Sequence, residues 1–220
     1  MFLLEDYMTR VIDGLRKRFG EHLVYVGLQG SYLRGEADEE SDLDLMVVLD
    51  ELSVADMEAY REVIESLEHS ERSCGFLCGR EELAHWNALE LCHLLHTTKD
   101  YVGTLSSLIP PFEERDARQF VKLSLGNLYH ELFHRYVHAS AEENRAALPR
   151  SAKSVFFLLQ NMYWLKTGVF APTQKELLTM LEEGDRRVLL CAMRLRAGEI
   201  CFEEDFACLF SWCRNALCAF

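Results

Sequence analysis

The sequence lacks any hydrophobic run that approaches the roughly 20 residues needed to cross a bilayer, so it predicts no membrane-spanning segment. It also lacks a basic stripe: 23 Lys and Arg stand against 36 Asp and Glu, for a formal net charge of −13. A surface of that sign repels phosphate backbones, which argues against stable nucleic-acid binding and favours a cationic small molecule. The N-terminus turns acidic at Glu5 and Asp6 before an apolar signal core forms, so we expect a cytoplasmic protein.

The eight cysteines include no Cys-x-x-Cys pair. A zinc site needs a second pair of ligands, and the spacing Cys74-x-x-x-Cys78 has no obvious one. Without a secretion signal, these residues are expected to be reduced thiols, most of them buried. The apolar, cysteine-containing C-terminal end permits a homodimer contact without showing one.

Proline is scarce, and two of the four prolines, Pro110 and Pro111, mark a change of pattern. Before them short apolar runs alternate with helical periodicity, and after them almost everything follows helical periodicity. We therefore expect an α+β fold, with a small mixed-sheet domain over residues 1–110 and an all-α helical bundle over 111–220. The predicted strands are 22–28, 43–49, 74–78 and 89–96, the last with a helix as its alternative. The predicted helices are 6–19, 53–69, 116–140, 151–167, 174–182, 185–197 and 203–218.

A Gly30-Ser31 pair follows the first predicted strand. Because glycine has no Cβ, the backbone at Gly30 can approach a ligand closely. A helix that opens at Ser31 presents amide groups and a hydroxyl to a phosphate. The spacing fits neither the P-loop nor the dinucleotide-binding glycine motif.

Asp42 and Asp44 lie two residues apart at the second predicted strand, so both carboxylates are expected to project from one face. Two neighbouring carboxylates repel each other unless a cation lies between them. Hard oxygen ligands suit Mg²⁺, which completes its coordination shell with water and substrate phosphates. A phosphate cradle ahead of such a pair is typical of phosphoryl or nucleotidyl transfer.

The joint pattern Gly30-Ser31-x-x-Arg34-Gly35-x-Ala37, then Ser41-Asp42-x-Asp44-Leu45, resembles the signature of the polymerase-β-like nucleotidyltransferase superfamily. A short α/β domain followed by a helical bundle is similar to the aminoglycoside and lincosamide nucleotidyltransferases and to the minimal nucleotidyltransferase group. By this resemblance the first predicted domain is a nucleotidyltransferase domain.

The resemblance also implies roles for single residues. Asp42 and Asp44 would be catalytic and would bind two Mg²⁺ ions. The nucleotide-binding residues would be Gly30, Ser31, Arg34 and Ser41, with the helical-domain residue Lys153 against the triphosphate. The implied reaction moves a nucleoside monophosphate from a triphosphate, expected to be ATP, to a hydroxyl of a small molecule such as an aminoglycoside-like antibiotic, and releases pyrophosphate. The alternatives are an antitoxin-like protein AMP-transferase and a non-catalytic nucleotide-binding protein.

The family usually supplies a third carboxylate from a neighbouring strand, as a metal ligand or general base. The segment Cys74–Cys78 contains no acid. We therefore predict Glu90, at the start of the fourth predicted strand, with Asp100 second and Asp50 third.

A competing motif is His130-Glu-Leu-Phe-His134, which matches the zincin pattern His-Glu-x-x-His. On a helix it places two imidazoles on one face, and His138 extends that face by a turn. No downstream residue stands out as the third ligand that a zincin needs. The alternatives are a helix face in the bundle and a contribution to an acceptor pocket.

Overall fold

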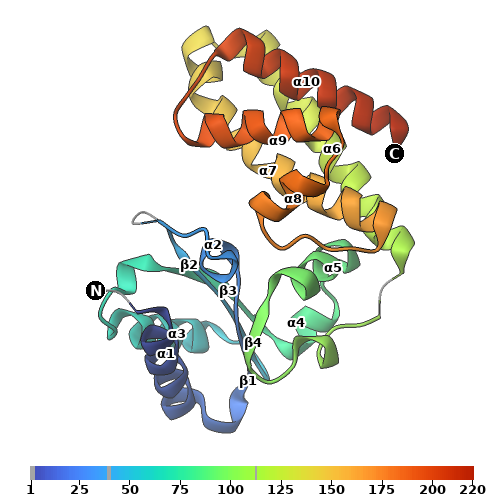
Figure 1. The fold of residues 1–220 in the computed structure, drawn as a ribbon. Coiled ribbons are helices and arrows are strands. Elements are labelled where there is room, and N and C mark those ends of the chain that lie inside the picture. Colours follow the sequence, from blue (N-terminus) through green and yellow to red (C-terminus); the bar gives the residue numbers. More distant parts are fainter. Residues whose placement is uncertain (1–2, 39–40, 112) are drawn as a thin grey trace. The chain divides into compact units, whose positions relative to one another are not determined.

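The computed structural model describes residues 3–38, 41–111 and 113–220. The chain divides into two compact units, Met1–Phe112 and Glu113–Phe220, which are described separately (Figure 1). Every strand among the described residues belongs to the first unit, and the second unit is helical. The expected α+β fold, a small mixed sheet followed by helices, is confirmed.

A four-stranded sheet with strand order β3-β2-β1-β4 forms the centre of the first unit. Strand β1 runs antiparallel to both β2 and β4, whereas β3 is parallel to β2. The connection from β2 to β3 passes through helix α3, because parallel strands need a crossover of this kind. The strands are β1 (Leu23–Leu28), β2 (Leu43–Leu49), β3 (Ser73–Gly79) and β4 (Lys99–Val102).

The two faces of the sheet carry separate cores, because successive residues of a strand point to opposite sides. The odd-numbered residues of β2 are buried with α1 (Leu4–Phe19) and α3 (Val54–Glu65). Met46, an even-numbered residue, lies in a second buried cluster with α4 (Arg80–Ala84) and α5 (Ala88–Thr97). Figure 1 shows these two helix pairs on either side of the sheet. Asp44 lies two residues from Met46 on β2, so its side chain points to the same face of the sheet, the one that α4 and α5 cover.

Helix α3 begins where the sequence predicts because Ser53 caps it. The Ser53 hydroxyl accepts a hydrogen bond from the Asp56 amide at 3.3 Å, and the Ser53 amide donates to the Asp56 carboxylate at 2.9 Å. Such a reciprocal capping box satisfies amide groups that the first helical turn otherwise leaves unpaired. The two bonds fix the point at which the chain leaves the loop after β2.

The prediction of a strand at 89–96 is wrong, because this segment forms α5. Leu91, Leu94 and Leu95 recur at helical intervals and contact the Met46 cluster. An apolar run this short does not distinguish a strand from a helix, and here helical packing against the sheet decides. One edge strand is the four-residue β4, which directly follows this helix and is absent from the predicted strands.

The sequence predicts all the helices described in the second unit, and their observed ends differ from the predicted ones by no more than two residues. The start of the helix predicted at 151–167 is the exception. That helix begins ten residues early, at Ala141, and continues through Pro149. Proline disfavours a helix interior, but here Ser140 caps the helix through Glu143, upstream of Pro149. The helices are α6 (Glu114–His138), α7 (Ala141–Thr167), α8 (Gln174–Met180), α9 (Glu183–Arg196) and α10 (Phe202–Ala219).

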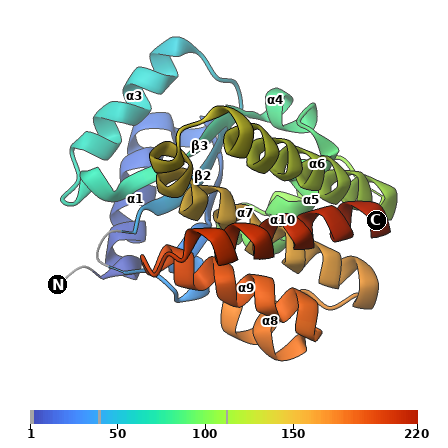
Figure 2. The same ribbon diagram turned by 90° about the horizontal axis from the view of Figure 1, so that it is seen from above.

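Helices α6, α7, α9 and α10 share one buried core, which includes Leu125, Leu159, Val188 and Leu209. Figures 1 and 2 both show α9 and α10 side by side. Over the described ranges of the chain, none of the helices has the length and apolar character needed to cross a membrane.

Candidate active site

The backbone at Gly30 packs directly against the Asp44 side chain. Gly30 has a φ of +71°, and a Cβ placed there would overlap the Asp44 carboxylate. The preceding residue joins the two strands, because the Gln29 amide donates to the Asp44 carbonyl at 2.8 Å. A side chain at residue 30 is therefore excluded by both backbone strain and space.

Asp42 and Asp44 are brought together at the N-terminal end of β2. Asp42 immediately precedes the strand and is exposed, whereas Asp44 is the second strand residue and is partly buried. Burial raises the pKa of Asp44, the negative charge of Asp42 raises it further, and the positive charge of Arg34 lowers it. The negative charges of Asp42 and Asp44 thus repel each other beside the Gly30 turn, as the sequence predicts.

Helix α2 (Gly30–Arg34) opens at the glycine, with Gln29 as its N-cap residue. Its last residue, Arg34, donates from Nε to the Glu36 carboxylate at 2.9 Å, and only 12% and 17% of these two side chains are exposed. Glu36 therefore holds the guanidinium in place on the helix. Since Arg34 also acts electrostatically on Asp44, a positive charge is fixed beside the carboxylate pair.

Ser41 closes the loop that precedes β2. Its hydroxyl donates to the Asp38 carboxylate at 2.7 Å and accepts from the Asp38 amide at 2.9 Å. The structure thus gives Ser41 a loop-closing contact, one residue before Asp42.

The donor set fits a hard divalent cation such as Mg²⁺. Asp42 and Asp44 offer carboxylate oxygens, and a cation between them would remove the repulsion that raises the Asp44 pKa. Within the described residues, no group of three or more His, Cys, Asp or Glu side chains is placed to hold a metal ion. Phosphate oxygens and water would therefore supply the remaining ligands, as is usual for Mg²⁺ in phosphoryl-transfer sites.

Glu90 lies on α5 rather than on a strand, so the predicted shared strand face with Cys92, Leu94 and His96 does not exist. Its carboxylate accepts a hydrogen bond from the Trp86 indole at 2.6 Å. Trp86 in turn packs edge-on against Phe76 of β3, with ring centroids 4.9 Å apart. Glu90 therefore belongs to the helical layer over the sheet face that carries Asp44.

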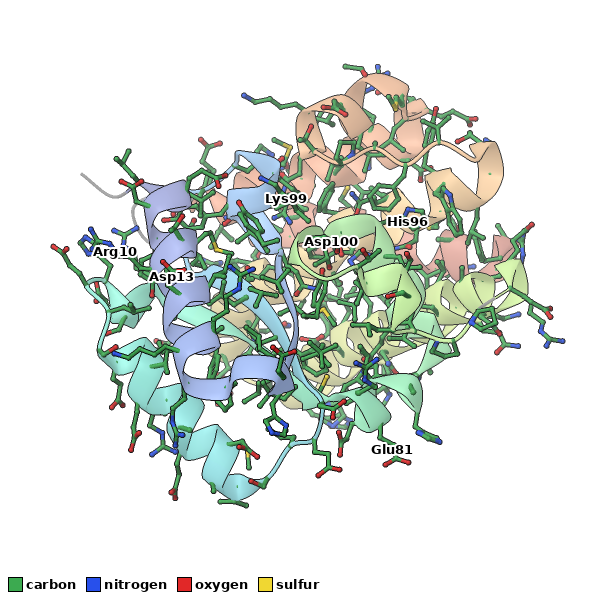
Figure 3. All side chains as sticks on the ribbon, turned by 90° about the horizontal axis from the view of Figure 1, so that it is seen from below. Arg10, Asp13, Glu81, His96, Lys99 and Asp100 are labelled. Carbon is green, nitrogen blue, oxygen red and sulfur yellow. The ribbon has the colours of Figure 1, made fainter. Side chains whose placement is uncertain are left out.

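The other two acids have structural partners. The Tyr25 hydroxyl donates to Asp100 at 2.6 Å, and burial followed by this bond raises the pKa of Tyr25. Figure 3 labels Asp100 and Lys99 on β4 with His96 of α5 nearby. Asp50 accepts from Arg80 at 3.2 Å in an exposed pair.

Two neighbours of the site were not identified from the sequence. Gln29, which follows β1, donates from its side-chain amide to Thr98, which precedes the neighbouring strand β4, at 2.8 Å. Cys74 stands level with Asp44 in the parallel register of β2 and β3, at the position where an acid would face Asp44. The strand pairing determines both placements, and no local sequence pattern reveals it.

The remaining predicted residues lie in the second unit. Lys153 is an exposed residue of α7, and its contact with a triphosphate stays a prediction. The rings of His130, His134 and His138 follow one face of α6, with centroids 5.7 and 4.9 Å apart. Glu131, the base that a zincin would need, instead accepts from Ser151 at 2.7 Å.

Residues 8–74, which contain this turn and the carboxylate pair, match the family model of the nucleotidyltransferase domain. Over 68 residues the chain is 38% identical to the protein adenylyltransferase MntA of Thermococcus cleftensis, covering 29% of this chain and 67% of that protein. The chain belongs to the nucleotidyltransferase-domain family. The resemblance inferred from the Gly-Ser and Asp-x-Asp motifs is confirmed, and the protein is a nucleotidyltransferase.

Two further comparisons place this nucleotidyltransferase among its relatives. It is 51% identical over 43 residues to a putative protein adenylyltransferase of Methanocaldococcus jannaschii, and the match covers 20% of this chain and 43% of that relative's length. The spectinomycin adenyltransferase AAD(9) from Enterococcus faecialis has a similar fold, with a TM-score of 0.60 at 17% identity. That similarity covers 97% of this chain and 98% of the other, so the two proteins share both the sheet and the helical part.

Proposed function

We propose that this nucleotidyltransferase transfers AMP from ATP, with Mg²⁺, to a hydroxyl group of a small cationic molecule. The observation that supports the chemistry is the packing of Gly30 against Asp44, with Asp42 alongside. This arrangement brings a close-approach backbone turn and two repelling carboxylates to one place, which is what binding a metal-bound triphosphate requires.

Each residue of the turn has a distinct task in this proposal. Asp42 and Asp44 would hold Mg²⁺, which neutralises triphosphate charge when bound. The amides and hydroxyl at Gly30 and Ser31 would bind phosphate oxygens, and Arg34, held by Glu36, would add a fixed positive charge. Acceleration would come mainly from alignment and charge neutralisation at the α-phosphate. Ser41 would act by positioning Asp42, and Lys153 remains the proposed triphosphate contact of the helical unit.

Glu90 is the proposed general base. The acceptor oxygen would form a bond to the α-phosphorus as its proton passes to the Glu90 carboxylate, and the bond to the bridging oxygen would break to release pyrophosphate. We expect Glu90→Gln to lower the transfer rate about 100-fold. Glu81→Gln, on the exposed surface of α4, is the matched control. Equal rates in the two variants would exclude Glu90 and leave Asp100→Asn as the next variant to measure.

The small-molecule acceptor is supported by charge and by architecture. The net charge of −13 attracts cations. The fold resembles that of a spectinomycin adenyltransferase along nearly its whole length. A protein acceptor is the second candidate, because one sequence relative is a protein adenylyltransferase and another is a putative one.

Incubation with ATP labelled at its α-phosphate separates the two acceptors. One arm supplies a panel of aminocyclitol and aminoglycoside compounds, and the other supplies a cell lysate depleted of small molecules. Labelled product in the first arm that requires both Asp42 and Asp44 supports the proposal. Label that enters only protein would replace it with the second candidate.

A further inference from the structure

Two cysteines of the second unit face each other between neighbouring helices, far along the chain from the nucleotidyltransferase motif. Cys191 of α9 is buried and Cys208 of α10 is partly buried. Both side chains line one cavity between these two helices, and the side chain of each acts on the pKa of the other. We propose that Cys191 and Cys208 are a redox-active pair, which a hydroperoxide converts to a reversible disulfide that joins α9 to α10.

A buried carboxylate fixes the position of Cys191. Asp205 is 1% exposed and accepts from Arg194 at 2.6 Å and from the Cys201 amide at 2.8 Å. The Cys191 thiol lies 3.3 Å from the same carboxylate. Asp205 precedes Cys208 by three residues on α10, so both lie on the face of that helix that meets α9. The contacts of Asp205 therefore hold Cys191 beside the face of α10 that carries Cys208.

The charges around Cys208 favour its thiolate. The hydrogen bond from Cys191 and then the Arg187 guanidinium lower the pKa of Cys208 to about 6, against the opposing effects of burial and of Asp205. The Cys208 and Asp205 side chains, by contrast, raise the pKa of Cys191 together with burial. Glu204 and Arg194 line the same cavity. These surroundings favour Cys208, the more exposed of the two residues, as the attacking thiolate and Cys191 as its partner.

A small oxidant can reach this thiolate. Cys208 and Cys191 line an open cavity of about 530 Å³ between α9 and α10, and Cys208 also lines a second one of about 510 Å³. Buried Cys213 contrasts with this arrangement, because burial raises its pKa to about 11. Cys208 thus combines access with a favoured thiolate.

The oxidation balances in two steps. The Cys208 thiolate attacks one peroxide oxygen, the O–O bond breaks, and a sulfenic acid and hydroxide form. The Cys191 sulfur then attacks the sulfenic sulfur, the S–O bond breaks, and the leaving hydroxide takes the thiol proton as water. Two electrons pass from the sulfur atoms to the peroxide, and an added dithiol reverses the change.

The test treats the full-length protein with one equivalent of hydrogen peroxide, blocks free thiols by alkylation and maps peptides without reduction. We expect a cross-linked peptide that contains Cys191 and Cys208, its loss in Cys208→Ser, and its retention in Cys218→Ser, an exposed control on the same helix. In Cys191→Ser, dimedone should trap a sulfenic acid at Cys208. Recovery of both residues as alkylated thiols in oxidised wild type would overturn the proposal.

A pH profile tests the order of reaction. In reduced wild-type protein, the rate at which iodoacetamide alkylates Cys208 should be half-maximal near pH 6. At that pH this alkylation should be about tenfold faster than alkylation of a cysteine peptide of pKa about 8.5, after allowance for the weaker nucleophilicity of a low-pKa thiolate. A half-maximum above pH 8 would contradict the assignment of Cys208 as the attacking residue.

Discussion

The Asp44 carboxylate occupies the space that a Cβ on residue 30 would need. Gly30 sits in the left-handed region at φ +71°, and the overlap involves Asp44 side-chain atoms. A single glycine therefore lets the turn that we propose to bind phosphate and the strand that we propose to bind the metal share one location.

We expect Gly30→Ala to lower nucleotidyl transfer at least about 100-fold, because displacing a catalytic group by an ångström has effects of that order. Gly35→Ala is the matched control. Gly35 also has a positive φ, +67°, but a Cβ there has nothing within 4 Å. The Gly35→Ala variant should lose only about 1 kcal/mol of stability and should keep most of its activity. Similar rates in the two variants would show that the contact with Asp44 does not matter.

The raised pKa of Asp44 makes stability depend on pH. The neutral acid is favoured by folding, so ionisation of Asp44 destabilises the metal-free protein above its raised pKa, and this penalty is absent below the ordinary carboxyl pKa of about 3.9. In the absence of Mg²⁺, Asp44→Asn should therefore melt at a higher temperature than wild type at pH 7, and the difference should shrink as the pH falls towards 4. Calorimetry at both pH values measures this. A variant that is less stable than wild type at pH 7 would contradict the account.

The Arg34–Glu36 pair is mostly buried, unlike the Arg10–Glu68 pair, whose side chains are 60% and 72% exposed. Removing one partner of a buried pair leaves a charge uncompensated, at a cost of about 3 kcal/mol. We expect Arg34→Met to cost that much in urea denaturation and to weaken ATP binding as well. The control Arg10→Met should cost less than about 1 kcal/mol. Equal losses of stability in the two variants would count against the assigned burial of Arg34.

The strongest local signals in the sequence predicted the structure well. Strand β2 spans the predicted residues 43–49, because a continuous apolar run follows Asp42. The helix predicted from residue 53 begins there, because Ser53 and Asp56 form a capping box. In the Gly30-Ser31 and Asp-x-Asp motifs, residue type and spacing alone determine the local geometry. The sequence therefore identifies the carboxylate pair.

Predictions that depended on tertiary contacts were less successful. Residues 89–96 form a helix because packing against Met46 favours it, and a short apolar run does not encode that choice. The four-residue β4 has too little pattern to detect, and its pairing with β1 defines it. Likewise, the parallel register that sets Cys74 beside Asp44 arises only when β3 joins the sheet.

The measurement that tests the central claim most directly is a thermal-shift titration with ATP, with and without Mg²⁺. Wild type, the double variant Asp42→Asn/Asp44→Asn and the control Asp13→Asn, an exposed residue of α1, would be compared. A ligand that binds only the folded protein stabilises it by about 2.7 kcal/mol at a concentration 100-fold above its Kd, and the melting temperature rises accordingly. The account predicts a Mg²⁺-dependent shift in wild type and in Asp13→Asn that disappears in the double variant. An equal ATP shift in all three proteins, or one indifferent to Mg²⁺, would contradict it.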